Sequence, residues 1–125
     1  MRKSWTRSLA ALVVSAAALQ AAVSYNWKNV VIGGGGFVDG IVFHPTVRGL
    51  MYARTDMGGA YRWNPASSSW TPITDFIGAI SDDMGILSIA LDPQDGSKVY
   101  LLTGKYSNAW TSEYGKVMVS SDTGR

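Results

Sequence analysis

The sequence repeats itself with a spacing of 48 residues, and this repeat restricts the fold more than any single motif. The first copy contains Gly40-Ile-Val-Phe-His-Pro45, and Tyr52 follows its proline by seven residues. The second contains Leu87-Ser-Ile-Ala-Leu-Asp-Pro93, and Tyr100 follows at the same distance. Repeats of about 40–50 residues with several strands each are typical of propeller blades. The spacing therefore predicts an all-β fold of about two β-propeller blades.

The two copies differ in length near their ends. Each continues with a segment that opens on glycine, Gly59–Trp63 in the first and Gly115–Val119 in the second, and the offset has grown to 56 residues. An insertion of eight residues within Gly104–Tyr114 explains this growth. Because a blade buries its apolar residues only against neighbouring blades, we expect two blades not to be stable alone.

Apolar runs of strand length fill the chain from Tyr25 onward, separated by Gly, Pro, Asn, Asp and Ser. No window keeps the 3.6-residue period of a helix, so we expect strands throughout. The predicted strands are Lys28–Ile32, Gly40–Phe43, Leu50–Arg54, Gly59–Trp63, Trp70–Ile73, Leu87–Leu91, Lys98–Thr103 and Lys116–Ser120.

The N-terminus has the pattern of a secretory signal peptide. Arg2, Lys3 and Arg7 precede an apolar run, Leu9–Leu19, of 11 residues. A membrane-spanning helix needs about 20 residues, so a membrane anchor or a buried helix is the weaker interpretation. We predict a signal peptide over residues 1–24, with the mature chain starting between Ala22 and Tyr25, and a secreted, extracellular protein with no membrane partner afterwards.

Charge and residue content exclude several classes of function. Removing residues 1–24 leaves eight basic and nine acidic residues, a net charge of −1. A basic surface for nucleic acid is therefore not expected. The chain has no cysteine, and His44 is its one histidine. No group of residues has the spacing of metal ligands, and we expect neither a metal nor a cofactor.

A turn motif stands at the C-terminus. Ser120-Ser-Asp-Thr-Gly124 matches the first five positions of the Asp-box, Ser-x-Asp-x-Gly-x-Thr-Trp, a hairpin motif of sialidase-like propellers. Ser and Asp side chains accept hydrogen bonds from the amides of such a turn, and Gly adopts a positive φ. Asp56–Tyr61 looks like a degenerate copy in the first unit. Since the motif breaks off one residue before the end, we expect residues 25–125 to be an incomplete propeller domain.

Two longer blocks resemble one family. Trp27–Val38 and Tyr52–Trp63 closely resemble the start of glycoside hydrolase family 74, the xyloglucanases, and weaker likeness continues through Ser88–Pro93 and Tyr106–Trp110. The resemblance implies two seven-bladed propellers in tandem, with a polysaccharide cleft between them. It also implies hydrolysis of the β-1,4-glucan backbone with inversion, by one catalytic Asp from each propeller.

The resemblance assigns the roles of individual residues. It makes Asp56 the general base, while the partner acid would lie far downstream, outside this sequence, so this piece alone would be inactive. Trp110 and Tyr61 are candidates for contact with sugar, because aromatic faces stack on sugar rings. For Tyr61, Trp63 and Trp70 a place in the core is the favoured interpretation.

Two further groups have plainer explanations than a site. Asp82 and Asp83 are adjacent carboxylates, which on a strand would point to opposite faces, and a solvated turn is the better interpretation. Gly33–Gly36 lacks the Lys-Ser/Thr of a phosphate-binding loop. We expect a flexible turn there, or a close approach of backbone to sugar.

The expected function is that of a monomeric enzyme acting on xyloglucan or a related plant cell-wall polysaccharide. Endo-acting and reducing-end-specific modes both stay open. One alternative is a non-catalytic Asp-box propeller that binds glycans or proteins. Another is a sialidase-like enzyme, which needs an arginine triad that Arg48, Arg54 and Arg62 do not evidently form.

Overall fold

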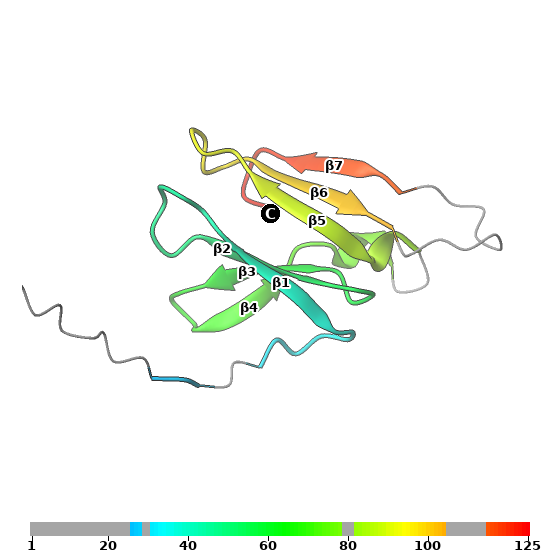
Figure 1. Cartoon of the computed structure of the whole chain (residues 1–125), viewed down its shortest axis with the longest axis horizontal. Helices are drawn as coiled ribbons and strands as arrows, with labels where there is room; N and C mark the ends of the chain where they lie inside the picture. Colours follow the sequence, from blue (N-terminus) through cyan, green and yellow to red (C-terminus); the bar gives the residue numbers. More distant parts are fainter. Residues whose placement is uncertain (1–25, 29–30, 79–81, 105–114) are drawn as a thin grey trace, which may run out of the picture.

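Two antiparallel sheets make up most of the part of the chain that the structure describes (Figure 1). The computed structural model describes residues 26–28, 31–78, 82–104 and 115–125. Within them the first sheet contains β1 (Val38–Phe43), β2 (Met51–Thr55), β3 (Ala60–Asn64) and β4 (Ser69–Pro72) in that order. The second contains β5 (Ile86–Leu91), β6 (Val99–Thr103) and β7 (Val117–Ser120). The predicted all-β class is confirmed.

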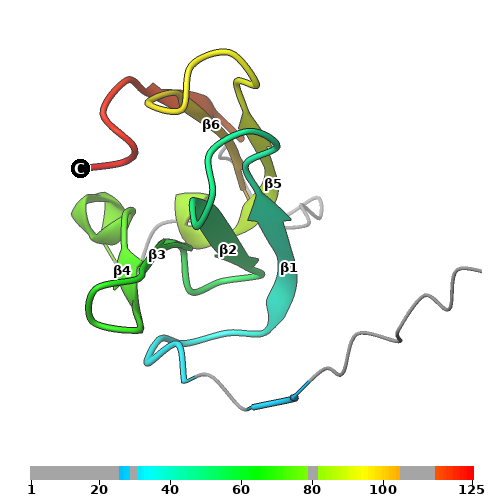
Figure 2. The ribbon, with the colours of Figure 1, turned by 90° about the vertical axis from the view of Figure 1, so that its left-hand side faces the viewer.

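Two short 3-10 turns, η1 (Asp75–Ile77) and η2 (Asp82–Met84), lie between the sheets in sequence. The first strands of the two sheets, β1 and β5, lie on the same side of the molecule (Figure 2). No helix among the described residues is long and apolar enough to cross a membrane.

The registers of the strands confirm the 48-residue repeat. Val42 pairs with Tyr52 in the first sheet, and Ala90 pairs with Tyr100 in the second. Both first pairs also carry an irregularity at the same place, between Val38 and Gly40 and between Ile86 and Ser88. A β-bulge bends its strand and increases the local twist, so the two sheets share a shape as well as a pairing.

The third strands correct the size of the predicted insertion. Tyr52 faces Arg62 across the first sheet, and Tyr100 faces Val119 across the second. The offset between third strands is therefore 57 residues, which makes the insertion nine residues long instead of eight. The predicted strands agree with the observed ones within two residues, with one exception. Residues 29–30 of the predicted strand Lys28–Ile32 lie outside the described part, and the described residues beside them carry no strand.

The main core lies between the sheets, because each turns an apolar face toward the other. Tyr52 is fully buried there, and Ala53, its neighbour on β2, is equally buried on the opposite face of the first sheet. The strand β6 instead alternates between buried and exposed residues. The residues that form the core between the sheets are Tyr52, Ala60, Ile86, Ile89, Val99 and Leu101.

The outer face of the second sheet is apolar and open. Its exposed side chains are Tyr100, Leu102, Val117 and Val119. Tyr100 is the repeat counterpart of Tyr52, and Val117 that of Ala60, by the registers above. Tyr52 and Ala60 are fully buried against the second sheet. The open face is therefore equivalent to the face of the first sheet that the second one covers.

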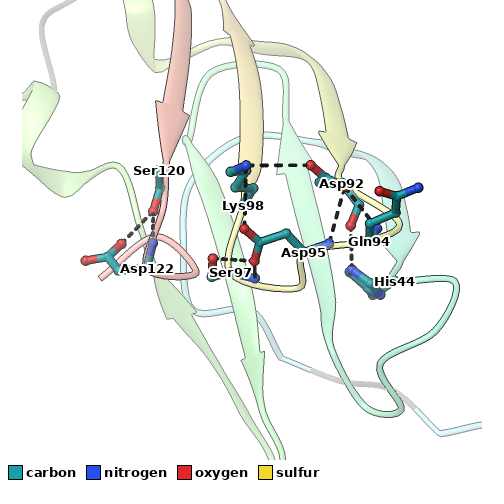
Figure 3. Close-up of polar contacts among 8 residues, drawn as sticks. All are labelled: His44, Asp92, Gln94, Asp95, Ser97, Lys98, Ser120 and Asp122. Carbon is teal, nitrogen blue, oxygen red and sulfur yellow. Dashed lines mark hydrogen bonds and ion pairs between the residues drawn. The ribbon is translucent and has the colours of Figure 1, made fainter.

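One end of the sheets is organised by local hydrogen bonds (Figure 3). His44 Nδ1 accepts from the backbone N–H groups two and three residues ahead, at 3.2 and 3.0 Å. Asp92, its repeat counterpart, does the same through Oδ1 at 2.9 and 3.3 Å. The other ring nitrogen of His44, Nε2, donates to the Asp92 carbonyl at 2.9 Å. His44 therefore joins the two repeats and has no catalytic arrangement.

The Asp-box chemistry is confirmed at the same end. Ser120 Oγ accepts from the N–H groups of Asp122 and Gly124, at 3.1 and 2.8 Å, and Gly124 has φ +77°. The predicted degenerate copy at Asp56–Tyr61 is wrong, however. The Asp-box follows a third strand, β7, whereas Asp56 follows a second strand, β2. An Asp-x-Gly sequence suits many turns, and only the register shows which turns are equivalent.

Candidate functional site

Asp56 occupies the turn between β2 and β3, at the end of the sheets opposite His44. Its backbone N–H donates to the Phe37 carbonyl at 3.1 Å. In return the Phe37 N–H donates to Asp56 Oδ1 at 2.7 Å. The residue is half-buried, and no described residue donates a hydrogen bond to the second carboxylate oxygen, Oδ2. One oxygen is therefore held by the Phe37 backbone, and the other has no donor within the described part of the chain.

The run Gly33–Gly36, called the glycine strap below, lies directly against this turn. A Cβ atom at position 36 would be 2.6 Å from Asp56 Oδ1. A Cβ atom at Gly58 would be 1.7 Å from the Gly35 carbonyl oxygen. Such separations are far below van der Waals contact, so only glycine fits at both places. The close approach predicted for the strap exists in the structure, but its partner is the Asp56 turn.

Tyr61 supports the same turn from within the fold. Its side chain is 5% exposed, and its hydroxyl donates to the Gly58 carbonyl at 2.7 Å. Burial raises the pKa of this phenol, and the nearby Asp75 carboxylate adds to the effect. Trp70 is also buried and meets the half-buried Trp63 edge to face, with ring centroids 5.3 Å apart. The structure thus places Tyr61 in the core, as the favoured interpretation predicted, and offers its ring little surface for sugar.

The second sheet reaches the Asp56 turn through η2. The Gly59 N–H donates to the Met84 carbonyl at 2.8 Å, and the Gly104 N–H donates to the Gly85 carbonyl at 2.8 Å. A Cβ atom at Gly85 would lie 2.7 Å from the Asp56 carbonyl oxygen. Gly104, the last described residue before the β6–β7 connection, therefore lies near the Asp56 turn. Trp110 belongs to that connection and lies outside the described residues.

The prediction of a solvated turn at Asp82 and Asp83 is wrong for Asp83. This residue is 5% exposed. Its Oδ1 accepts from the Thr103 hydroxyl at 2.9 Å, and its Oδ2 forms an ion pair with Lys116. The hydrogen bond from Lys116 lowers the pKa of Asp83, burial opposes this, and the Thr103 hydroxyl adds to the lowering. Asp83 therefore links η2 to the two ends of the β6–β7 connection.

Lowering the pH should reduce the stability that the Asp83 carboxylate contributes. Because the folded-state pKa of Asp83 is lowered, the stability that its carboxylate contributes is complete above the unfolded value of about 3.9. It is lost as the pH falls through the folded-state pKa. We expect Asp83→Asn to destabilise the protein by about 1–2 kcal/mol at pH 7. The difference from the wild type, measured by thermal unfolding between pH 7 and pH 3, should shrink below about pH 4, and a gap that stays constant would contradict this role.

Comparison with known proteins places the chain. No family model matches it. A xyloglucanase of Paenibacillus sp. is 48% identical over 98% of this chain and 13% of its own length. A xyloglucanase of Hypocrea jecorina is 50% identical over 90% of the chain and 14% of its own. An oligoxyloglucan-reducing end-specific xyloglucanase of Emericella nidulans is 47% identical over 81% of the chain and 12% of its own.

Solved structures agree with these relatives. The GH74 xyloglucanase of Xanthomonas campestris superimposes with a TM-score of 0.68 at 48% identity, over 82% of this chain and 14% of that one. The chain belongs to glycoside hydrolase family 74. A second family 74 enzyme, from Niastella koreensis, gives a TM-score of 0.62 at 41% identity, over 77% of this chain and 14% of that one. The resemblance of the two glycine-rich blocks to family 74 is thereby confirmed.

Two cavities of this family 74 chain are lined by described residues alone, and both lie away from Asp56. The larger, about 640 Å³, is a gap between the outer strands of the two sheets, with Ile73, Phe76 and Met118 in its wall. A smaller one, about 360 Å³, has Arg48, Arg62 and Arg125 among its lining residues. Neither is a site around the candidate base. We therefore place the candidate site by the carboxylate and its hydrogen bonds.

The structure also bears on the sialidase-like alternative. Arg54 does not line the cavity of the other two arginines, and its guanidinium donates to Asp39 and to the Ile86 carbonyl. Arg48, Arg54 and Arg62 therefore do not meet at one site. The same part of the chain contains no group of three or more His, Asp or Glu side chains that could hold a metal ion.

Proposed function

We propose that the protein containing this chain is a secreted xyloglucanase that cleaves the β-1,4-glucan backbone of xyloglucan with inversion, and that Asp56 is its general base. The observation that supports the proposal is the hydrogen bonding of the Asp56 carboxylate. One oxygen accepts the Phe37 N–H at 2.7 Å, and no described residue donates a hydrogen bond to the other oxygen of this half-buried side chain. The names of the relatives support the substrate, but the chain spans only 12–15% of their length.

The repeat supports a propeller as the architecture of the whole protein. The open apolar face of the second sheet is equivalent to the covered face of the first, so a third sheet of the same kind would cover it. Packing of this head-to-tail type continues until it closes, and for propellers of four-stranded sheets it closes as a ring. A fourth strand beside β7, in the place that β4 takes beside β3, would also fill the larger cavity.

The geometry suits the base of an inverting reaction. Such a base takes a proton from the water that attacks the anomeric carbon, on the face opposite the leaving group. The acid that protonates the leaving oxygen stands about 6.5–9.5 Å away, which leaves room for that water. In this proposal the acid comes from a second propeller, and the substrate lies in the cleft between the two. Residues 1–24 direct the enzyme out of the cell.

The stereochemistry of the product tests this function. The full-length protein is incubated with xyloglucan, and the newly formed reducing ends are followed by proton NMR. Inversion gives the α-anomer first, with the β-anomer appearing only by mutarotation. A β-anomer formed first would exclude the inverting mechanism, and no release of sugar would favour a non-catalytic binding propeller. Sialosides in a parallel reaction test the sialidase-like alternative, and the sizes of early products separate endo-acting from reducing-end-specific cleavage.

A further inference from the structure

We propose that the glycine strap is a positioning device for the Asp56 carboxylate. This inference rests on the proposed function, because positioning matters only if Asp56 acts as the base. It concerns residues that touch the base and not the sugar. The two glycine-containing blocks of the sequence, 33–36 and 58–59, lie against each other beside the Asp56 carboxylate. Neither block alone indicates this contact.

The hydrogen bonds at Phe37 define the position of the carboxylate. Phe37 accepts from the backbone of Asp56 at 3.1 Å and donates to its side-chain Oδ1 at 2.7 Å. The strand end and the carboxylate are therefore fixed by the same residue. Since a hydrogen bond to a charged acceptor is short and directional, it selects one rotation of the carboxylate plane. In that rotation Oδ2 is the oxygen left for water.

The absence of side chains on the strap allows this contact. Gly36 has φ +85°, a conformation that L residues with side chains rarely adopt. Its missing Cβ would lie 2.6 Å from Asp56 Oδ1 and 3.1 Å from the Gly58 nitrogen. A methyl group there must push the carboxylate away or lift the strap from the turn. Either movement breaks the geometry around Oδ1.

A rigid support holds the strap from below. A Cβ atom at Gly34 would lie 1.7 Å from the Tyr61 hydroxyl oxygen, so the strap rests on the end of this ring. The same hydroxyl donates to the Gly58 carbonyl, within the Asp56 turn. Tyr61 is buried and belongs to β3, a central strand of the first sheet. Asp56 lies on a turn, but Tyr61 connects that turn to a central strand through two contacts, one with Gly34 of the strap and one with the Gly58 carbonyl.

The strap is expected to affect turnover more than binding. A displacement of about 1 Å at a catalytic group can cost about 10²-fold in rate. The sugar subsites that determine binding involve no residue of the strap in this proposal. We therefore expect disruption of the strap to lower kcat while leaving KM nearly unchanged.

Two alanine variants of the full-length protein test the proposal. Gly36→Ala introduces the methyl group beside Oδ1. Gly49→Ala is its matched control, because Gly49 lies outside the strap, in the connection between β1 and β2, with a similar φ of +82° and no atom within 4 Å of its missing Cβ. Both variants carry similar backbone strain, and only Gly36→Ala adds a contact with the carboxylate. We expect Gly36→Ala to lower kcat about 10–100-fold with KM within about twofold, and Gly49→Ala to keep kcat within about twofold of the wild type.

The outcomes separate this proposal from the one on which it rests. Equal loss of kcat in both alanine variants, or normal kcat in Gly36→Ala, would overturn the positioning role. If Gly36→Ala does not fold, Tyr61→Phe replaces it, since it removes only the hydroxyl under the strap. We expect about a fivefold lower kcat there at unchanged KM, and a normal kcat would overturn the role. Asp56→Asn is assayed in parallel, and near-normal turnover in that variant would contradict the proposed function itself.

Discussion

Replacement of Asp56 by asparagine in the full-length protein is expected to lower kcat on xyloglucan by about 10²–10⁴-fold, the contribution of a positioned general base. The amide has nearly the shape of the carboxylate, and its oxygen can still accept the Phe37 N–H at the Oδ1 position. It cannot take a proton from water. Folding and affinity for xyloglucan should therefore stay close to those of the wild type, as measured by thermal unfolding and by binding to the polysaccharide.

A second carboxylate provides the control for this experiment. Asp39 lies in the bulge of β1, at the same end of the first sheet, and forms an ion pair with Arg54 at 3.4 Å. Both partners are partly exposed, so the pair contributes at most about 1 kcal/mol to stability. We expect Asp39→Asn to keep kcat within about twofold of the wild type. Near-normal turnover in Asp56→Asn would rule out the base assignment.

A large effect on stability is expected at Gly59. Its φ is +84°, and a Cβ atom there would lie 2.2 Å from the hydroxyl oxygen of Thr74, which is 1% exposed. Gly49, in the connection between β1 and β2, has φ +82° and open space around its missing Cβ. Gly49→Ala should therefore cost only the backbone strain, about 1–2 kcal/mol. Gly59→Ala should cost about 1–3 kcal/mol more, because the core cannot absorb the methyl group.

Thermal unfolding of the two variants, side by side, measures the difference. The Thr74 hydroxyl also accepts a hydrogen bond from the Ala60 N–H at 2.9 Å. Displacement of Thr74 would therefore weaken the start of β3. Equal melting temperatures for Gly49→Ala and Gly59→Ala would show that the contact with Thr74 relaxes without cost. In that case backbone strain alone would explain both.

The sequence predicted those features that depend on neighbours along the chain. Strands, their approximate ends and the 48-residue repeat follow from the alternation of apolar runs with turn residues. The hydrogen bonds of Ser120 in the Asp-box span four residues and were predicted for the same reason. The identity of Asp56 as a candidate came from the likeness of a continuous block to a family. Each of these features depends on residues within one short stretch of sequence.

The tertiary structure decided the features that depend on residues far apart. The carboxylate of Asp56 meets a residue 19 positions earlier, and Asp83 meets Lys116 across 33 positions. The local sequence at Asp83 therefore predicts a solvated turn, because the lysine and the threonine that contact its carboxylate come from distant parts of the sequence. The register likewise decided that the Asp56 turn is no Asp-box, because Asp-x-Gly suits turns of several kinds. Local sequence determines which backbone conformations, including turns, are low in free energy. The packing of the two sheets determines which turns lie next to each other.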